Sequence, residues 1–282
     1  QQSQGAAFQG TISYGPCELT GDEARLLLMA PINPNGRSNS DVVRPWTNGR
    51  DITTRPEDYW IIFFPDGMDE RSAALYEAPF SAVERLVKPY RAAKKNKDLN
   101  RYWWRLWRSR PDLLSALRGR SRQIVTPRVS KHRLFVWRPT TVVVDSAAVA
   151  IARDDDTTFG ILHSFAHEIW TLRLCTWLGV GNDPRYTPSS TFETFAFPEG
   201  LSPDLSATKY EADHRAKRVA KAAAKLDELR ENWLNPSDLV KREPEVVPGY
   251  PDRVLPKNQA AAEQLKKRTL TNLYNERPKW LA

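Results

Sequence analysis

The amino-acid sequence predicts an α+β fold, in which a sheet flanked by helices is followed by a smaller α-helical C-terminal part. Three observations lead to this prediction. Several segments before residue 110 have the apolar spacing of helices. Between residues 122 and 164 the apolar segments are short and rich in β-branched and aromatic residues, which favours strands. Residues 207–233 then form an Ala- and Lys-rich helical pattern.

The first part of the chain alternates turns, helices and one strand. Thr20 and Glu23 have the spacing of a capping box, which predicts a helix after Thr20. Asn48-Gly49 predicts a turn, and the apolar run "YWIIFF" at 59–64 predicts a buried strand. Two helices are expected next, over 68–80 and 81–95, punctuated by Pro79 and Pro89.

The segment "RYWWRLWRSRP", residues 101–111, concentrates aromatic rings and arginines. On a helix its apolar side chains, with Leu99, fall within an arc of roughly 140°. The segment therefore predicts an amphipathic helix whose rings enter the core, except Trp104, which sits beside the arginine face. The opposite face would carry three cations: Arg101, Arg105 and Arg108.

Four segments after this helix predict the sheet: 122–130, 132–139, 140–152 and 158–164. The acidic run "RDDDTT" is expected to form a turn between two of these strands. The apolar residues of 165–178 repeat at helical spacing, which predicts a helix that ends at Gly179.

Two regions are expected along the chain. Residues 1–203 form the main lobe, and residues 204–282 form a helical C-terminal segment. The latter begins with a helix over 207–233, whose apolar stripe includes Val219, Ala223 and Trp233. A Pro-rich link at 236–256 and a further helix at 258–270 complete it.

Positive charge is concentrated in one block. The net charge is +8, but residues 85–138 contain 17 Lys or Arg and only two Asp, a local charge of +15, so the other residues sum to −7. Such asymmetry is typical of a protein that binds a polyphosphate partner. The alternative is a solvated charged surface.

Cys17 and Cys175 have no disulfide or metal-ligand spacing, which favours a reducing, cytoplasmic setting. The sequence contains no apolar run of the ~20 residues that cross a bilayer and no signal-peptide pattern, so no membrane partner is expected. The absence of an initiator Met suggests a piece of a longer protein.

Enzymatic and scaffold functions are the alternatives to binding a polyphosphate partner. Asp154, Asp155 and Asp156 could hold a divalent cation in a metal-dependent nuclease, although neighbouring acids on a strand end point to opposite faces. His163 and His167 have the spacing of helical zinc ligands, but Thr171 stands where a metalloprotease motif needs a second His. No catalytic or metal-ligating residue is therefore assigned. The helix at 207–233 would suit a protein-interaction scaffold.

Two loops combine donors and acceptors in the way that nucleic-acid interfaces require. The segment "TPRVSKHRLF" at 126–135 places five polar or basic side chains beside a strand, and "GVGNDPRYTPSS" at 179–190 follows a helix. An Arg can donate two parallel hydrogen bonds to guanine, and an Asp or Asn can accept a hydrogen bond from the amino group of cytosine or adenine. Each segment could equally be a surface loop.

The ordered series "VVRPWTNGRDI", "RYWWRLWRSRPDL", "TPRVSKHRLFVW", "DDDTTFGILHSFAHEIW" and "RYTPSSTFETFAFP" resembles the region after the methyltransferase core in MmeI-like (type IIL) restriction–modification enzymes and related adenine-specific DNA methyltransferases. The resemblance covers nearly the whole chain. It implies a target recognition domain with a mixed, largely antiparallel sheet and flanking helices, as in specificity subunits. It also implies a bacterial defence function, in which this domain reads double-stranded DNA for an adenine-N6 methyltransferase of the same polypeptide.

Candidate site residues follow from the loops and from this resemblance together. The expected base-reading residues are Arg128, Ser130, Lys131, His132, Asn182, Asp183 and Arg185. The expected contacts to the DNA backbone, beside the three arginines of 101–108, are Arg133, Tyr186 and Thr187.

Two catalytic motifs of the resembling family have no counterpart in this sequence. Asn33-Pro34 and Asn235-Pro236 do not continue as the N-P-P-Y/F motif, and no F-x-G-x-G loop is present. This chain is therefore expected to bind DNA without methylating or cutting it, with no cofactor of its own. S-adenosylmethionine is expected to bind the methyltransferase domain. The resemblance also predicts further helical sequence after Ala282.

Overall fold

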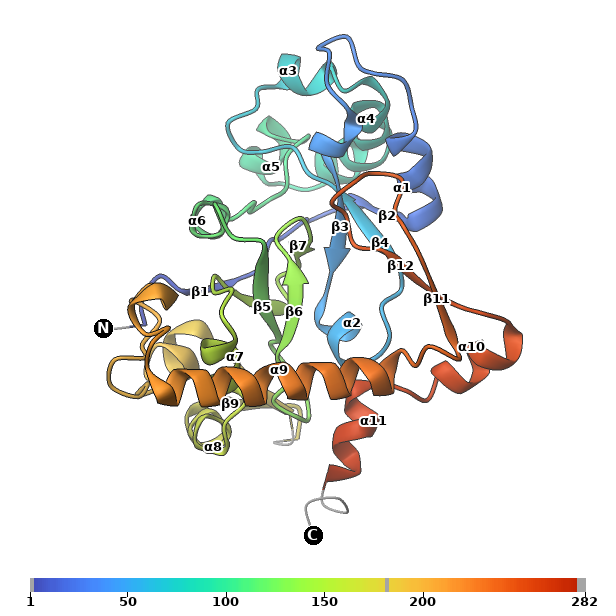
Figure 1. Ribbon diagram of the computed structural model, residues 1–282. Coiled ribbons are helices and arrows are strands. Elements are labelled where there is room, and N and C mark those ends of the chain that lie inside the picture. Colours follow the sequence, from blue (N-terminus) through green and yellow to red (C-terminus); the bar gives the residue numbers. More distant parts are fainter. Residues whose placement is uncertain (1–2, 181–182, 278–282) are drawn as a thin grey trace.

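The computed structural model describes residues 3–180 and 183–277 and has an α+β fold with two four-stranded sheets (Figure 1). The first sheet has the order β2-β4-β3-β7 and is antiparallel except for the parallel pair β3–β7. The second has the order β1-β8-β5-β6 and is antiparallel throughout. The prediction of a mixed, largely antiparallel fold with flanking helices is thus confirmed.

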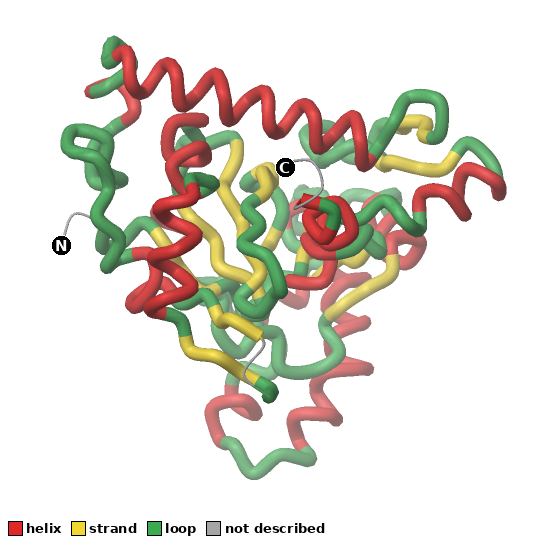
Figure 2. The backbone as a smooth tube through the Cα atoms, turned by 90° about the horizontal axis from the view of Figure 1, so that it is seen from below, coloured by secondary structure: helices red, strands yellow, loops and turns green. Residues whose placement is uncertain are grey.

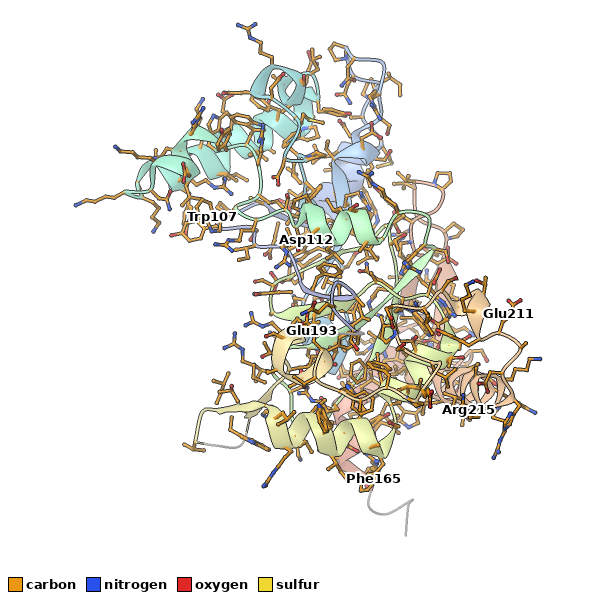
Figure 3. The ribbon with its side chains drawn as sticks, turned by 90° about the vertical axis from the view of Figure 1, so that its left-hand side faces the viewer. Trp107, Asp112, Phe165, Glu193, Glu211 and Arg215 are labelled. Atoms are coloured by element: carbon orange, nitrogen blue, oxygen red, sulfur yellow. The ribbon has the colours of Figure 1, made fainter. Side chains whose placement is uncertain are left out.

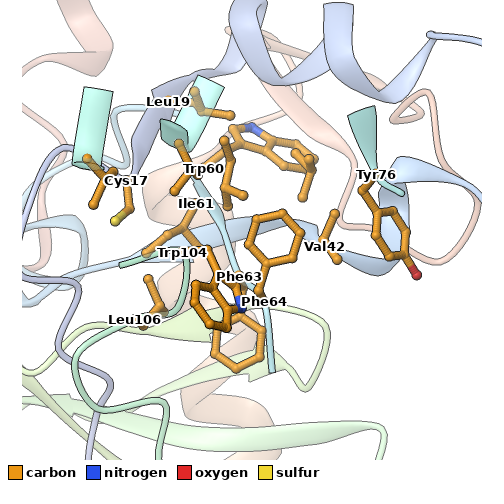
Figure 4. Close-up of a cluster of buried hydrophobic side chains, with 14 of the residues drawn as sticks. Cys17, Leu19, Val42, Trp60, Ile61, Phe63, Phe64, Tyr76, Trp104 and Leu106 are labelled. Atoms are coloured by element: carbon orange, nitrogen blue, oxygen red, sulfur yellow. The ribbon is translucent and has the colours of Figure 1, made fainter. Parts of the chain in front are cut away.

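The upper lobe is the first sheet with the helices around it. The sheet strands are β2 (Glu18–Thr20), β3 (Val43–Thr47), β4 (Tyr59–Ile62) and β7 (Val143–Val144). The helices are α1 (Gly21–Leu28), α3 (Glu70–Ala74), α4 (Glu77–Ala92) and α5 (Lys97–Arg101), beside the 3₁₀ turn Asn39–Asp41. The predicted capping box is present, because the Thr20 side chain accepts from the backbone of Glu23 and the Glu23 carboxylate accepts in return. Trp60, Phe64 and Trp104 belong to its aromatic core (Figure 4).

The lower lobe is the second sheet with the helices that cover it. Its sheet strands are β1 (Ala7–Gln9), β5 (Arg122–Pro127), β6 (Val136–Pro139) and β8 (Ala148–Ile151). Helices α7 (Asp156–Leu162), α8 (Phe165–Leu174) and α9 (His214–Leu234) pack around them, with the hairpin β9 (Thr176–Leu178) and β10 (Asp183–Arg185). The π-helix Pro188–Phe192 and the 3₁₀ turn Ala207–Lys209 lie in the connection to α9.

Long helix α9 runs along one edge of the molecule (Figure 2) and completes the lower core. Ala216 and Ala223 are buried on it, and Val219 contacts Gly160 of α7. The C-terminal elements α10 (Gln259–Leu265) and α11 (Leu270–Asn275) follow, and Leu270 and Tyr274 pack with Ile52 in a third core. The division expected at residue 203 therefore does not coincide with a division of the hydrophobic core.

The two lobes are joined by short helices and by the C-terminal hairpin. Helix α2 (Gly49–Thr53), between β3 and β4 of the first sheet, packs against β5 of the second, and helix α6 (Pro111–Ala116) leads from the upper lobe into β5. The hairpin pairs β11 (Val240–Glu243) with β12 (Arg253–Pro256). Buried Arg25 of α1 forms an ion pair with Glu245 just after β11, with Nη2 and Oε2 2.9 Å apart. The Pro-rich segment 236–256 is thus a hairpin packed on the upper lobe rather than a link. In the described part of the chain, no helix is long and apolar enough to cross a membrane.

Residues 158–164 do not form the expected strand, because α7 begins at Asp156. The Asp155 side chain caps this helix by accepting from the backbone N–H of Thr158 at 2.7 Å. The acidic run is therefore a helix start rather than a turn between strands. Most of α7 is buried, including Phe159 and Leu162, so its apolar run lacks the amphipathic spacing that distinguishes a helix.

The tryptophan-rich segment is a compact irregular loop rather than the predicted helix, because α5 ends at Arg101. Buried Arg91 of α4 donates to five backbone carbonyls, three of them in this loop, and those carbonyls are therefore not available to a helix. Trp104 is also buried, contrary to expectation, and its Nε1 donates to the Met68 carbonyl.

Several element boundaries also differ from the predictions. Asn48-Gly49 does not form a free turn: Asn48 caps α2 by accepting from Arg50 and Asp51. Pro79 and Pro89 lie within α4 instead of interrupting it. Helix α8 ends at Leu174, before Gly179, because the chain enters strand β9.

Candidate nucleic-acid interface

A groove of about 480 Å³ lies between the start of α2, the end of β5 and the hairpin β9–β10. We call it the arginine groove, because three arginines line it together with apolar and small residues, and no carboxylate of the described residues does. Its lining residues are Gly49, Arg50, Thr53, Arg128, Val129, Ala147, Leu178 and Arg185.

The arginine groove brings together the two loops that the sequence marked as base-reading segments. Val129 forms an isolated antiparallel bridge with Arg185. Beside it, the backbone N–H of Tyr186 donates to the carbonyl of Arg128 at 2.6 Å. Residues 128 and 185 are thus neighbours although 57 positions separate them in the sequence.

The three arginines of the groove are held differently. Arg128 is the most fixed, because its Nη1 donates to the Ser146 carbonyl at 2.9 Å. Arg50 is exposed, and its ion pair with Glu57 spans 3.4 Å in solvent. Among the residues that the structure describes, the half-buried Arg185 guanidinium has no hydrogen-bond or ion-pair partner. The groove therefore offers guanidinium donors that are still free to bind an acceptor.

Gly49 permits the close approach that shapes this groove. A Cβ built at this position would lie 2.8 Å from the backbone oxygen of Ala147, on the turn between β7 and β8. Only glycine fits at that distance without moving the backbone. Gly49 therefore fixes how near the start of α2, and Arg50 with it, comes to the β7–β8 turn.

Lys131 and His132 lie in the loop between β5 and β6, next to helix α11. The Lys131 Nζ donates to the Asn275 Oδ1 at 2.7 Å, and the His132 Nε2 lies 2.9 Å from the same oxygen. Of the remaining expected readers, Asp183 and Thr187 are half-buried, whereas Asn182 lies outside the described residues. The base-reading roles of these positions stay predictions.

Three of the expected DNA contacts face inward instead. Tyr186 is fully buried, with its hydroxyl 3.3 Å from His167 Nε2. Arg133 is buried and donates to the carbonyls of Ser130 and Pro184, which ties the β5–β6 loop to β10. The buried Ser130 hydroxyl donates to the His132 carbonyl at 2.7 Å. Because all three side chains are buried inside the lower lobe, their burial favours support of the groove over direct contact with DNA.

The two histidines of α7 and α8 belong to this support. His163 Nδ1 lies 2.9 Å from the Phe159 carbonyl, and His167 Nδ1 lies 2.8 Å from the Leu162 carbonyl. Burial lowers the pKa of His167 to about 4 and also lowers the pKa of His163 well below its ordinary value. Both rings are therefore neutral at physiological pH and pack against Phe135.

The basic block contributes a second set of cations on the same side of the molecule as the hairpin. Lys94, Lys95 and Lys97, at the junction of α4 and α5, are exposed. In Figure 3 the teal helices α4 and α5 and the yellow hairpin β9–β10 both extend to the left, whereas α9, with Arg215, lies on the right. Of the three arginines expected to contact phosphates, Arg101 and Arg108 are exposed, but Arg105 is half-buried and donates to the Met68 carbonyl.

The three consecutive aspartates each have their own arginine partner. Asp154 pairs with Arg120 at 3.0 Å, Asp155 with Arg153 at 2.7 Å, and Asp156 with Arg122 at 3.0 Å. Within residues 3–180 and 183–277, no cluster of three His, Cys, Asp or Glu side chains is arranged to hold a metal ion. The pairing gives these carboxylates a structural role and does not favour the nuclease alternative.

A second cavity of about 480 Å³ lies between the upper lobe, the end of α9 and the hairpin β11–β12. Its lining mixes both signs of charge, and several of the charged and polar groups bind one another. Arg242 contacts Glu231, and Arg55 donates to Asn235. This cavity therefore lacks the excess of one charge that the arginine groove has.

The sequence did not single out Arg50 or the cluster Lys94, Lys95 and Lys97. Arg50 follows the capping pair Asn48-Gly49, which places it at a helix start, but only the fold brings that start next to β5 and β10. The lysines were counted within the basic block, although their position beside the hairpin depends on the arrangement of the lobes.

Comparison with known proteins finds similarity to a solved structure. No family model and no curated protein match the chain. A solved structure of the type IIL restriction–modification enzyme MmeI in complex with DNA is similar over 97% of this chain, with a TM-score of 0.60 and 15% sequence identity. The chain spans 31% of the length of that enzyme's chain. At this identity, the match establishes a related fold.

Proposed function

We propose that this chain binds double-stranded DNA sequence-specifically and that the arginine groove is its base-reading surface. The observation that carries the proposal is the convergence of Arg50, Arg128 and Arg185 on one groove, which no carboxylate of residues 3–180 and 183–277 lines. Arginine forms paired hydrogen bonds with the O6 and N7 acceptors of guanine in the major groove. Phosphates lack this pattern and position the protein without carrying sequence information.

The distribution of charge supports the same proposal. Helices α4 and α5, whose junction carries the exposed lysines, extend to the same side as the hairpin β9–β10 (Figure 3), so one DNA duplex would meet both. In this arrangement the lysines, with Arg101 and Arg108, contact phosphates, while the arginine groove, Lys131, His132 and Asp183 face base edges.

We further propose that the chain is the specificity module of a larger cytoplasmic adenine-N6 DNA methyltransferase or restriction–modification protein. The related fold of a restriction–modification enzyme solved with DNA supports this wider function. S-adenosylmethionine would then bind the methyltransferase domain of the same polypeptide, and the described chain would select the site that this domain modifies.

The test is selection from a random pool of DNA duplexes at low salt, followed by sequencing of the bound fraction. The full chain should enrich one motif, and Arg185→Ala should relax one base position by about 1–3 kcal/mol while random-duplex affinity changes little. Arg218→Ala is the matched control, because Arg218 is an exposed arginine on α9, away from the groove. Failure of the wild-type chain to enrich any motif, at every salt concentration tried, would refute the proposal.

A further inference from the structure

Helix α11 contacts α2, which lines the arginine groove, and the β5–β6 loop, which follows the groove residues Arg128 and Val129. On one side, the Thr271 hydroxyl donates to the carbonyl of Thr53, at the end of α2. On the other side, Asn275 binds the β5–β6 loop through Lys131 and His132. Helix α11 is thus placed to set the position of the loop relative to α2.

Helix α11 is anchored in the hydrophobic core. Leu270 and Tyr274 are buried beside Ile52 and Leu134, and the Tyr274 hydroxyl contacts Arg230 of α9. The Tyr274 ring also lies against the His132 imidazole, with centroids 5.9 Å apart. Asn275, one residue later, is exposed and therefore presents its amide from a fixed base.

The chemistry of Lys131 determines the roles of the other two side chains. An ammonium group only donates hydrogen bonds, so the Asn275 atom that it meets is the oxygen acceptor. His132 Nε2 approaches the same oxygen and must therefore be the protonated nitrogen. In the neutral ring, Nδ1 is then left as an acceptor, which suits the amino group of an adenine or a cytosine.

We propose that Asn275 is a positioning residue for DNA reading, which orients Lys131 and fixes the His132 tautomer through one amide oxygen. This inference rests on the proposed function. A neutral amide leaves the positive charge of Lys131 intact, and two of the three ammonium N–H groups stay free to bind DNA. Holding both side chains before DNA arrives reduces the conformational entropy lost on binding.

The experiment compares Asn275→Ala and Asn275→Asp with the wild-type chain. Asn272→Ala is the matched control, because Asn272 is exposed on the same helix and donates to the Lys267 carbonyl rather than to the loop. Three quantities are measured: the His132 tautomer by ¹⁵N NMR of the free protein, the motif enriched from a random duplex pool, and the salt dependence of binding to a random duplex.

Asn275→Ala should mix the two His132 tautomers and broaden the enriched motif at one or two base pairs, with random-duplex affinity unchanged. In Asn275→Asp, His132 should keep the Nε2–H tautomer, because the new carboxylate accepts a hydrogen bond from the imidazole. The same carboxylate should form an ion pair with Lys131. Because Lys131 is then held by a carboxylate, it should no longer read its base, and the enriched motif should broaden at that position. Asn272→Ala should change none of the three quantities.

Two results would overturn this inference, and they differ from failure of the proposed function. An unchanged His132 tautomer in Asn275→Ala removes the positioning role, whatever the DNA results. An unchanged motif in Asn275→Ala, in a chain whose wild type enriches one, removes the reading role but leaves sequence-specific binding intact. If the wild type enriches no motif, the proposed function fails, and the NMR comparison still decides whether Asn275 orients His132.

Discussion

Neighbouring residues of the same loop have opposite roles in this protein. Arg185 lines the arginine groove, whereas Tyr186 beside it is fully buried; Lys131 is exposed, whereas Arg133 lies in the interior. The sequence identified these segments because they combine arginines, amides and hydroxyls. The sequence could not show which of these side chains face solvent and which face the interior, because an arginine or a tyrosine suits either a DNA-binding surface or a buried hydrogen-bond network.

At the residue scale, Gly49→Ala should disturb the groove most directly. The added Cβ would meet the Ala147 oxygen at 2.8 Å, so α2 must move away from the β7–β8 turn. We expect a decrease of about 1–3 kcal/mol in the free energy of unfolding, measured by urea denaturation, because overpacking has this cost. The enriched DNA motif should also weaken.

Gly67→Ala is the control for this substitution, because a Cβ at Gly67 would meet no atom within 4 Å. Equal stability of the two variants would show that the close approach of α2 to the β7–β8 turn is not what requires glycine at position 49.

At the scale of elements, the sequence predicted those whose signals are local. The capping box of α1 and the strand β4 were confirmed because side chains within one turn or one short run determine them. Helix α7 was missed because it is buried on nearly all sides. The loop at 102–110 was missed because Arg91, from helix α4, donates to its backbone carbonyls. The sequence of the loop itself contains no pattern from which this contact could be predicted.

The packing of α8 against β10 should make stability depend on pH. Burial keeps His167 neutral, with a folded pKa of about 4 against an ordinary value of 6.5. The unfolded chain therefore binds the proton first, and stability that is complete above about pH 6.5 declines as the pH falls towards about 4. The contribution is about 3 kcal/mol, at 1.36 kcal/mol for each pKa unit.

This pH dependence is measured by urea unfolding at neutral and at acidic pH. His167→Gln should reduce the decline in stability between the two conditions, whereas His214→Gln should not, because His214 is 83% exposed. An equal pH dependence in His167→Gln and the wild type would mean that other buried groups, rather than this ring, carry it.

At the scale of the whole molecule, the sequence does not show which face of the protein carries the exposed lysines. The sequence located a basic block, but only the arrangement of the lobes places helices α4 and α5, whose junction carries Lys94, Lys95 and Lys97, on the side of the hairpin and α9 on the other side (Figure 3). The number of charges is thus readable from the sequence, whereas the face that they share depends on long-range packing.

Replacing Lys94, Lys95 and Lys97 together by alanine should weaken binding to all duplexes alike. The salt slope should decrease by about 0.9 for each phosphate that the variant no longer neutralises, hence by up to about 2.7. Replacing Lys217, Lys221 and Lys225 of α9 removes the same charge from the opposite side and should change the slope little. Equal slopes for the two triple variants would show that net charge, rather than a defined face, attracts DNA.

The ion pair between Arg25 and Glu245 has a consequence for how the protein is made. It joins residues 220 positions apart, in a lobe whose sheet is otherwise formed by residues before 145. At a synthesis rate of about 5–20 residues per second, Arg25 waits roughly 10–40 s for its partner to leave the ribosome. During that interval Arg25 is paired with Asp58, with Nη1 and Oδ2 2.9 Å apart, but not yet with Glu245, so the upper lobe gains this contact only after residue 245 has been synthesised.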